Sequence, residues 1–477
     1  MRAKSASILL LIGVTGCATI RPRAGFDDVE RLMASRTSGQ VAWKDGADGA
    51  VEERVRELLA SELTPDAAVQ LALLNSPALL ATYERLGIAQ ADLVQAGLLP
   101  NPVIHASVRF AVSGPGPGAE LSLLQDVIGM LVIPLRKRVA AAEFEVAKLE
   151  VAQTVIDLVT DVKAAFYALQ GAQQMVELRR IVAETTQLSA DIARRQHEAG
   201  NVTDLDLANE QTLAAQAKID LAQAEAEALA GREELNALLG LWGQRTGWKI
   251  AARLPTLPEE EVPRERMESL AVKQRLDLAA AREAVEVRER SLGLTRVTAL
   301  FMDGAFGADA EKEPGGTWAV GPAIEFAAPL FDQGQAAVGR VQAELRERQR
   351  RFAALAIRIR SQVRRARTRM YAARDRTAYF EKVVLPLRHR VVEQSQLHYN
   401  AMQIGAFQLL QAKREEIEAG RAYVETLTDY WLARTELERA VGGELPLPAG
   451  IPPPAGVPAE PQPDEAPQHQ HHHHHGG

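Results

Sequence analysis

The strongest candidate for metal chemistry in this sequence is a run of histidines close to its C-terminus. The imidazoles belong to His469, His471, His472, His473, His474 and His475. Neutral imidazole is a good ligand for Cu²⁺, Ni²⁺ and Zn²⁺. Two interpretations stay open: an expression tag, which says nothing about function, or a native metal-binding tail. A run of five histidines after His-Gln is irregular for a tag, which favours a native tail.

Motifs for catalysis are absent from the sequence. There is no Walker phosphate-binding loop, no dinucleotide-binding glycine fingerprint, no His-Glu-x-x-His and no cysteine pair. Gly304-x-x-Gly307 and the glycines and prolines at 113–118 indicate turns and not phosphate-binding loops. We therefore expect no enzyme activity and no resident cofactor, and only Cu, Zn or Ni as ions that the histidine tail could bind.

The N-terminus predicts export and attachment to lipid. A short cationic start is followed by an apolar stretch at 8–14, too short to span a bilayer, and then by small residues up to Cys17. Residues 14–17, Val-Thr-Gly-Cys, resemble the bacterial lipobox, whose cysteine is lipidated. Because Cys17 is the only cysteine, it cannot form a disulfide within the chain. The alternative is an ordinary signal peptide with an incidental cysteine. Ala18, in place of the aspartate of inner-membrane retention, favours a lipid-anchored protein of the outer membrane.

The composition indicates long helices. Aromatic residues make up 5% of the chain, and alanine, leucine, arginine and glutamate are abundant. The net charge of −7 argues against a nucleic-acid partner. The arginine-rich stretch at 346–376 is interspersed with acidic and apolar residues, so it is interpreted as the solvated face of a helix.

The elements fall into two copies of one unit, repeated after roughly two hundred residues. Each copy begins with a helix, at about 65–99 and 270–291, and continues into a predicted β-hairpin. Strands are expected within 102–112, 119–132, 292–302 and 317–330, with glycine-rich turns at 113–118 and 303–316. Apolar and polar residues alternate well only in the first and last of these strands, as in Ile104, Ala106, Val108 and Phe110.

No apolar run after residue 17 is long enough for a membrane helix, so a membrane span would need strands. Four strands cannot close a barrel, because the smallest membrane barrels have about eight. Several chains would be required, and three copies would give twelve strands.

The hairpins are followed by long helices at 136–198 and 333–398 and by alanine-rich return helices at about 203–240 and 406–441. Residues at 4-3-4-3 spacing predict a coiled-coil seam on each long helix. These residues are Val155, Val159, Val162, Phe166 and Leu169, and Ile359, Val363, Ala366, Met370 and Ala373. The fold class is therefore mainly α, with antiparallel coiled-coil helices and two β-hairpins per chain.

The sequence therefore predicts six segments. A leader at 1–17 is followed by an N-terminal periplasmic segment at 18–60 and a first repeat at 61–250, with its hairpin at about 102–133. A linker at 251–265 leads to a second repeat at 266–442, with its hairpin at about 292–331, and to a disordered tail at 443–477.

Two segments of the first repeat resemble the TolC family of outer-membrane factors. Residues 63–77, Leu-Thr-Pro-Asp-Ala-Ala-Val-Gln-Leu-Ala-Leu-Leu-Asn-Ser-Pro, look like the opening helix of that family, and residues 89–102 end in the Pro-Asn-Pro that leads into its first strand. The resemblance covers nearly all of 60–442. It implies a homotrimer with a twelve-strand barrel in the outer membrane and a twelve-helix periplasmic tunnel. It also implies that a periplasmic adaptor and an inner-membrane pump dock at the far, helical tip.

The resemblance also places the tips that would form the gate. Residues 197–206 look like the first helix–turn–helix tip, with Gly200 at the family's glycine. In the second tip Met402 stands at that position, and Gly405 follows three residues later. Gln408 and Gln411 fall where relatives carry the aspartates of the closed entrance, and a ring of glutamines can only form hydrogen bonds.

Asp204 and Asp206 are the remaining acidic candidates at the tips. They could line the surface beside the entrance, or they could be solvated carboxylates at a helix start.

The expected function is passive export through a duct, driven by a pump, with metal cations suggested by the histidine tail. Export of drugs or other small molecules is the alternative. A periplasmic adaptor or structural coiled coil is a third reading, although an adaptor should have one helical hairpin and not two.

Overall fold

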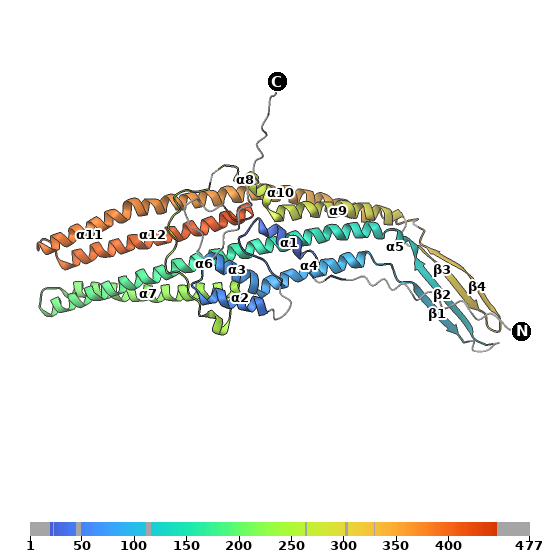
Figure 1. The fold of residues 1–477 in the computed structure, drawn as a ribbon, viewed down its shortest axis with the longest axis horizontal. Coiled ribbons are helices and arrows are strands. Elements are labelled where there is room, and N and C mark those ends of the chain that lie inside the picture. Colours follow the sequence, from blue (N-terminus) through green and yellow to red (C-terminus); the bar gives the residue numbers. More distant parts are fainter. Residues whose placement is uncertain are drawn as a thin grey trace, which may run out of the picture.

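The chain forms an elongated molecule with a four-stranded sheet at one end and two helical hairpins at the other (Figure 1). The computed structural model describes residues 20–21, 23–43, 49–110, 116–262, 265–300, 304–328 and 330–445. Cys17 and the tail histidines, His469 and His471 to His475, lie outside the described residues. No helix among the described residues combines the length and the apolar character that crossing a membrane would need.

The elements follow the order expected for two repeats. The first repeat contains α1 (Phe26–Ala34), α2 (Gly49–Ala60), α3 (Pro65–Asn75), α4 (Pro77–Ala96), β1 (Val103–Arg109), β2 (Gly118–Asp126), α5 (Val127–Leu131), α6 (Ile133–Glu198), α7 (Asp204–Leu239) and the 3₁₀ turn η1 (Gly243–Thr246). The second contains α8 (Met267–Gln274), α9 (Leu276–Leu300), β3 (Gly304–Lys312), β4 (Trp318–Phe326), α10 (Gln335–Tyr379), the π-helical turn η2 (Phe380–Val384), α11 (Leu385–Asn400) and α12 (Ala406–Val441).

Helix α6 is long because nothing in its sequence stops it. Its proline, Pro134, lies in the first turn, where proline is tolerated. Its 66 residues extend over roughly 99 Å at about 1.5 Å per residue. Both predicted coiled-coil seams are confirmed, since every seam residue of α6 and α10 is buried.

The two hairpins join into one antiparallel sheet of order β1-β2-β3-β4. The inner pair, β2 and β3, connects the repeats, with Leu121 opposite Ala310. Gly307 is required there, because a Cβ at this position would lie 1.8 Å from the carbonyl oxygen of Leu123.

The sheet has one apolar face and one polar face, as predicted for its first and last strands. Because paired residues share a face, the register places these apolar side chains together: Ile104, Val108, Leu121, Leu123, Phe306, Trp318, Val320, Ile324 and Phe326. The opposite face carries His105, Ser107, Arg109, Glu120, Ser122, Asp126, Asp309, Glu311 and Glu325. All the apolar residues named here are exposed in the single chain.

Two strand predictions were wrong. Residues 292–300 belong to α9, and the strand begins at Gly304, within the segment predicted to be a turn. The small residues of β3 adopt a strand because β3 pairs with a strand on either side, so tertiary context overrides local propensity. Residues 127–131 form α5 and not the end of a strand, because the Asp126 carboxylate accepts a 2.6 Å hydrogen bond from the Gly129 amide and caps the helix.

Two predicted helices are interrupted by proline. The opening helix divides into α3 and α4 at Pro77, which is the first residue of α4. The long second helix changes to π geometry in η2, just before Pro386. Proline lacks an amide donor, and π-turns often absorb such a break.

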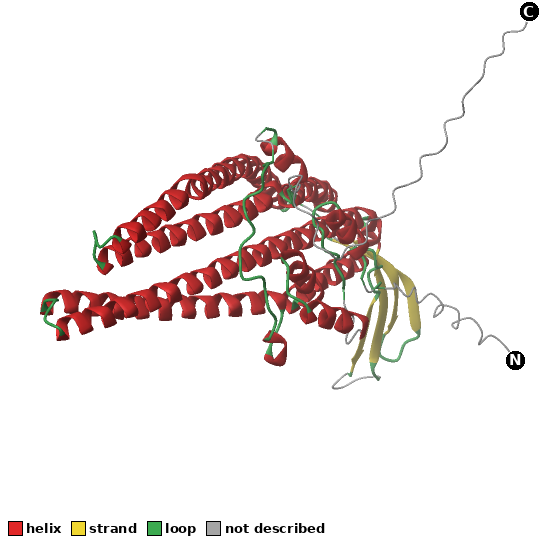
Figure 2. Cartoon of the chain, turned by 60° about the vertical axis from the view of Figure 1, so that its left-hand side comes forward, coloured by secondary structure: helices red, strands yellow, loops and turns green. Residues whose placement is uncertain are grey.

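The elements form an open wall with two free edges (Figure 2). Next to the sheet, α4 packs against α6, α6 against α9, and α9 against α10. Towards the tips, α7 packs against α6, α6 against α12, and α12 against α10 and α11. One edge is therefore β1, α4 and α7, and the other is β4, α10 and α11.

A buried ionic cluster joins the two repeats midway along the wall. The Lys163 ammonium on α6 lies 2.8 Å from a Glu444 carboxylate oxygen and 3.5 Å from one of Glu438 on α12. Arg434, also on α12, forms a 2.5 Å ion pair with Glu261 of the connector. Burial raises the pKa of the Glu438 carboxyl, while the Lys163 charge opposes that rise.

Candidate functional site at the helical tips

The first tip is a tight turn between α6 and α7. Gly200 has φ +78°, and its amide donates a 2.8 Å hydrogen bond to the His197 carbonyl. Thr203 caps α7, because its hydroxyl oxygen accepts a 3.1 Å hydrogen bond from the Asp206 amide. Glycine suits this left-handed position since it carries no Cβ.

The second tip repeats this turn 202 residues later with a different residue at its centre. Met402 has φ +58°, and its side chain is 94% exposed. Its amide donates a 2.9 Å hydrogen bond to the Tyr399 carbonyl. Gly405 is the N-cap of α12, and the Gln408 side-chain oxygen accepts a 3.1 Å hydrogen bond from the Gly405 amide. Gln408 thus caps its own helix, as a residue at this position of a capping box does.

Met402→Gly should stabilise the second tip by about 1 kcal/mol, because a non-glycine residue in the left-handed region costs roughly 1–2 kcal/mol. Amide hydrogen exchange of residues 399–406 should slow by roughly fivefold. Gly200→Met is the matched control and should accelerate exchange at the first tip by a similar factor. Unchanged exchange in both variants would show that the turns carry no strain.

The predicted acidic candidates lie on the solvent side of the first tip. The Asp204 side chain is 96% exposed, and its carboxylate lies 3.3 Å from Nε2 of His197. The Asp206 carboxylate accepts a 2.7 Å hydrogen bond from the Thr203 hydroxyl. On α12, Gln411 is exposed and donates a 3.0 Å hydrogen bond to Glu415. These contacts are all local to one tip, so the single chain does not bring the candidates of the two tips together.

A contact between the two hairpins was not predicted from the sequence. Glu210 on α7 accepts a 2.5 Å hydrogen bond from Ser189 on α6 and forms a 3.6 Å ion pair with Arg414 on α12. The Glu210 and Arg414 side chains are only 15% and 14% exposed. A comparison of the two repeats could have indicated this contact. Glu210 in the first repeat stands at the position that the buried Ala412 occupies in the second. A carboxylate on a buried face needs a partner.

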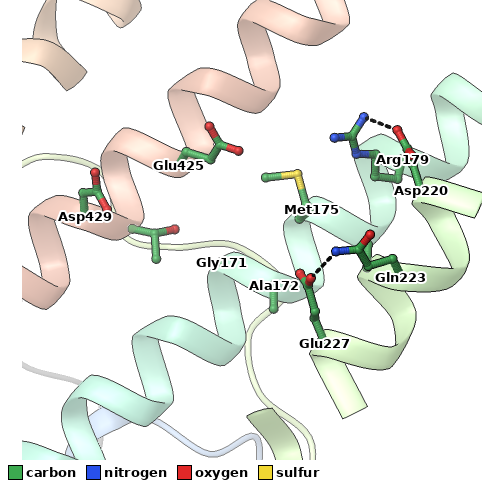
Figure 3. Close-up of a pocket in the computed structure, with 11 residues that line it drawn as sticks. Gly171, Ala172, Met175, Arg179, Asp220, Gln223, Glu227, Glu425 and Asp429 are labelled. Carbon is green, nitrogen blue, oxygen red and sulfur yellow. Dashed lines mark hydrogen bonds and ion pairs between the residues drawn. The ribbon is translucent and has the colours of Figure 1, made fainter. Parts of the chain in front are cut away.

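A polar cavity of about 380 Å³ separates the hairpins further from the tips (Figure 3). Its carboxylates come from α7 and α12, and each has a partner: Asp220 lies 3.3 Å from Arg179, Glu227 accepts a hydrogen bond from Gln223, Glu425 pairs with Arg421, and Asp429 lies 3.3 Å from Arg376. Among the residues that the structure describes, no group of three or more His, Cys, Asp or Glu side chains is arranged to hold a metal ion.

The geometry defines a class of protein: one protomer of a channel that several copies complete. Its sheet has an apolar and a polar face, its wall has two unpaired edges, and its far end consists of two equivalent helical tips.

Comparisons with known proteins agree with this class. The sequence model of the family described as "Outer membrane efflux protein" matches residues 134–241. The cobalt-zinc-cadmium resistance protein CzcC of Cupriavidus metallidurans is 25% identical over 393 residues, which cover 80% of this chain and 91% of CzcC.

Two solved structures share the fold at low sequence identity. The Campylobacter jejuni CmeC outer membrane channel superposes with a TM-score of 0.67 at 15% identity, over 87% of this chain and 91% of CmeC. A membrane protein from Pseudomonas aeruginosa gives 0.66 at 16% identity, over 85% of this chain and 98% of that protein.

The chain thus matches the outer membrane efflux protein family, the TolC family, over residues 134–241 and has the fold of solved outer membrane channels over most of its length. It is an outer membrane efflux channel of a tripartite system, extends into the periplasm, and is a transport protein and not an enzyme. Channels of this family form trimers in efflux complexes. The adaptor alternative is wrong, since this chain has two helical hairpins joined through one sheet.

Proposed function

We propose that this protein is the outer membrane duct of a system that exports heavy-metal cations. The observation that carries the proposal is the charge on the polar face of the sheet. That face presents five carboxylates, Glu120, Asp126, Asp309, Glu311 and Glu325. Arg109 is the only arginine or lysine on it, and it forms a 3.1 Å ion pair with Glu120. A lumen lined in this way attracts cations and repels anions.

Three copies would bring this face to the inside of a closed wall. The free β4 edge of one copy would pair with the free β1 edge of the next, which leaves no unpaired strand in lipid. The result is a homotrimer with twelve strands and a tunnel of twelve helices. The apolar face would then meet the lipid, and the polar face would line the path.

The tips would form the periplasmic entrance, where an adaptor and an inner-membrane pump dock. Gly200, Asp204, Asp206, Met402, Gly405, Gln408 and Gln411 are the residues of this entrance. Gln408 and Gln411 cannot supply a ring of carboxylates, so the acidic residues of the entrance would be Asp204 and Asp206. Conduction is passive, and opening is a movement of the tip helices driven by the partners.

The likeness to CzcC supports metal cations as the substrate class. Two features outside the described residues fit the same function. Lipidation at Cys17 would anchor the N-terminus in the outer membrane. The tail histidines would bind Cu²⁺, Zn²⁺ or Ni²⁺ on the periplasmic side.

Growth of a deletion strain tests the substrate class. The strain, with and without the complementing gene, is grown on copper, silver, zinc, cobalt and nickel salts and on hydrophobic drugs. We expect complementable sensitivity to a few metals, at concentrations several-fold below the wild-type limit. A gene truncated after residue 465 is the matched comparison for the histidine tail. Sensitivity to drugs alone would contradict metal export and favour a multidrug duct.

A further inference from the structure

The two repeats end in the same turn, so their last residues can be compared one by one. Gly240 closes α7 with φ +67°, and Gly442 closes α12 with φ +93°. After each glycine, the next amide donates a hydrogen bond to a carbonyl five residues earlier, at 2.9 Å and 3.1 Å. The two glycines lie 202 residues apart, which makes Trp242 the counterpart of Glu444.

Within one chain, Glu444 completes a contact between the repeats. Its carboxylate lies 2.8 Å from the Lys163 ammonium on α6. Burial raises the pKa of the Asp66 carboxyl, the Lys163 charge lowers it and the Glu444 charge raises it, so Asp66 lies beside this pair. One turn further along α6, the Tyr167 ring stacks on Trp431 of α12 at 4.9 Å. A carboxylate, a cation and a tyrosine of the first repeat thus receive the end of the second repeat.

The second repeat carries the same three residue types. Arg367 and Tyr371 are the counterparts of the lysine and the tyrosine of α6, because every seam residue of α10 lies 204 residues after its counterpart in α6. Glu265 lies 199 residues after the carboxylate of α3, and the same step relates the closing 2.9 Å hydrogen bonds of α3 and α8. All three residues line an open groove of about 680 Å³ on the α10 edge of the wall.

The repetition makes the contact within a chain a template for the contact between copies. Within the chain, α6 of the first repeat packs against α12 of the second. The equivalent pair between copies is α10 of one copy and α7 of the next. A ring closes when each unit contacts its neighbour in the same way. The end of α7 should therefore meet the groove on α10.

The loop after α7 holds its tryptophan in a fixed position on the α7 side of the molecule (Figure 1). The Trp242 side chain is 82% exposed. Before it, the Asn75 amide donates 2.9 Å hydrogen bonds to two carbonyls, one of them that of Gly240. After it, the Arg232 guanidinium lies 4.0 Å from the centre of the Trp248 ring. An exposed tryptophan on a fixed loop loses little entropy on binding and suits the centre of an interface.

We propose that Trp242 of one copy seats against Arg367 and Tyr371 of the next copy. The indole takes the place that Glu444 takes within a chain and lies over the guanidinium as a cation–π contact. Leu229, which is 65% exposed and stands 202 residues before the tryptophan of the intrachain contact, covers the Tyr371 ring. The inference rests on the trimer of the proposed function and not on the exported substrate.

A disulfide placed by the same correspondence tests whether the two edges meet in this register. A Cβ at Gly171 on α6 would lie 3.2 Å from Cβ of Thr428 on α12, close to the roughly 3.8 Å of a disulfide. The counterparts of this pair between copies are Asp375 and Ala226, which are both exposed in the single chain. Ala226→Cys with Asp375→Cys should give a covalent trimer of the full-length protein on a non-reducing gel. Ala226→Cys with Arg369→Cys, on the side of α10 that faces α12, is the matched control and should not.

Exchange of charges tests the Trp242 contact itself. Trp242→Lys places a cation against Arg367, so the half-life of the trimer in detergent should shorten about thirtyfold, as expected for the loss of a buried tryptophan at an interface. Adding Arg367→Glu should restore most of that half-life. Trp242→Glu, which copies Glu444, should retain it. Gln244→Lys adds the same charge to an exposed residue of the same loop and should leave the half-life unchanged.

Failure of this contact and failure of the channel give different results. A parent trimer in which the cysteines at 226 and 375 do not link would refute the register. A half-life that Arg367→Glu does not restore would refute the seating of Trp242, and the trimer would stand in both cases. A parent protein that is monomeric would refute the trimer and the contact together. Growth on metal salts tests the exported substrate independently of all these outcomes.

Discussion

Lys163→Met should lower the free energy of unfolding by about 3–5 kcal/mol, because it leaves buried carboxylates without their cation. The Lys163 and Glu438 side chains are only 11% and 10% exposed, and Glu444 lies 2.8 Å from the ammonium. The cluster joins α6 of the first repeat to α12 of the second, so its loss should loosen the contact between the repeats. Tryptophan fluorescence measures the unfolding midpoint, since Trp431 stacks on Tyr167, one turn along α6 from Lys163.

The loss of unfolding free energy caused by Lys163→Met should depend on pH. Burial already raises the pKa of the Glu438 carboxyl, and removing Lys163 removes the charge that opposes this rise. In the variant the folded state therefore binds a proton more readily than the unfolded state, whose glutamate pKa is about 4.3. Stability then falls as the pH rises from that value to the folded-state pKa. The penalty should be largest at neutral pH and should shrink on acidification.

Lys413→Met is the matched control for this prediction. Lys413 also pairs with a glutamate, Glu416, but its side chain is 49% exposed, so its loss should cost less than about 1 kcal/mol. Equal penalties for the two variants, or a Lys163→Met penalty that does not change with pH, would contradict the role assigned to the buried cluster.

Asp309→Asn with Glu311→Gln should reduce the preference of the open channel for cations several-fold. The two carboxylates lie on the polar face of the sheet, so a trimer would lose six negative charges from its lumen. One unit charge about 4 Å from an ion in water changes its energy by about 1 kcal/mol, or about fivefold in local concentration. The reversal potential in a potassium chloride gradient across a planar bilayer measures the ratio of cation to anion permeability.

The control removes the same number of charges elsewhere. Glu259→Gln with Glu260→Gln neutralises two exposed carboxylates of the connector, which lie far from the sheet in the sequence and in the fold. This pair should leave the reversal potential unchanged. An equal shift in both double variants would mean that net charge, and not the lining of the sheet, sets selectivity.

Much of the helical architecture could be predicted because the repeating apolar positions are local information. The seams of α6 and α10 followed from spacing alone, and alanine-rich composition after a glycine-marked turn predicted the return helices to within a residue or two of α7 and α12. The strand β3 could not be predicted in this way. Its small residues have little preference of their own, and they form a strand only because β2 and β4 lie on either side. The alternation of Asp309 and Glu311 on one face was missed for the same reason.

The candidate site was predictable only where the chain repeats itself. Gly200 and Met402 occupy equivalent turns because each tip is a local structure set by neighbouring residues. The pair of Glu210 and Arg414 depends on how two hairpins more than two hundred residues apart lie against one another. Spacing within one helix carries no information about such a contact. The lipid site at Cys17 and the metal-binding tail stay predictions.

The π-turn η2 makes the two arms of the molecule structurally unequal, and we expect the second arm to bend more easily. The first arm is the uninterrupted α6, whereas the second changes to π geometry at Phe380–Val384, with 16 residues of α11 beyond that point. Those residues form a lever of roughly 24 Å at about 1.5 Å per residue, so a bend of about 10° would displace the tip by about 4 Å. If a partner docks at the tips, we therefore expect it to displace the second arm more than the first.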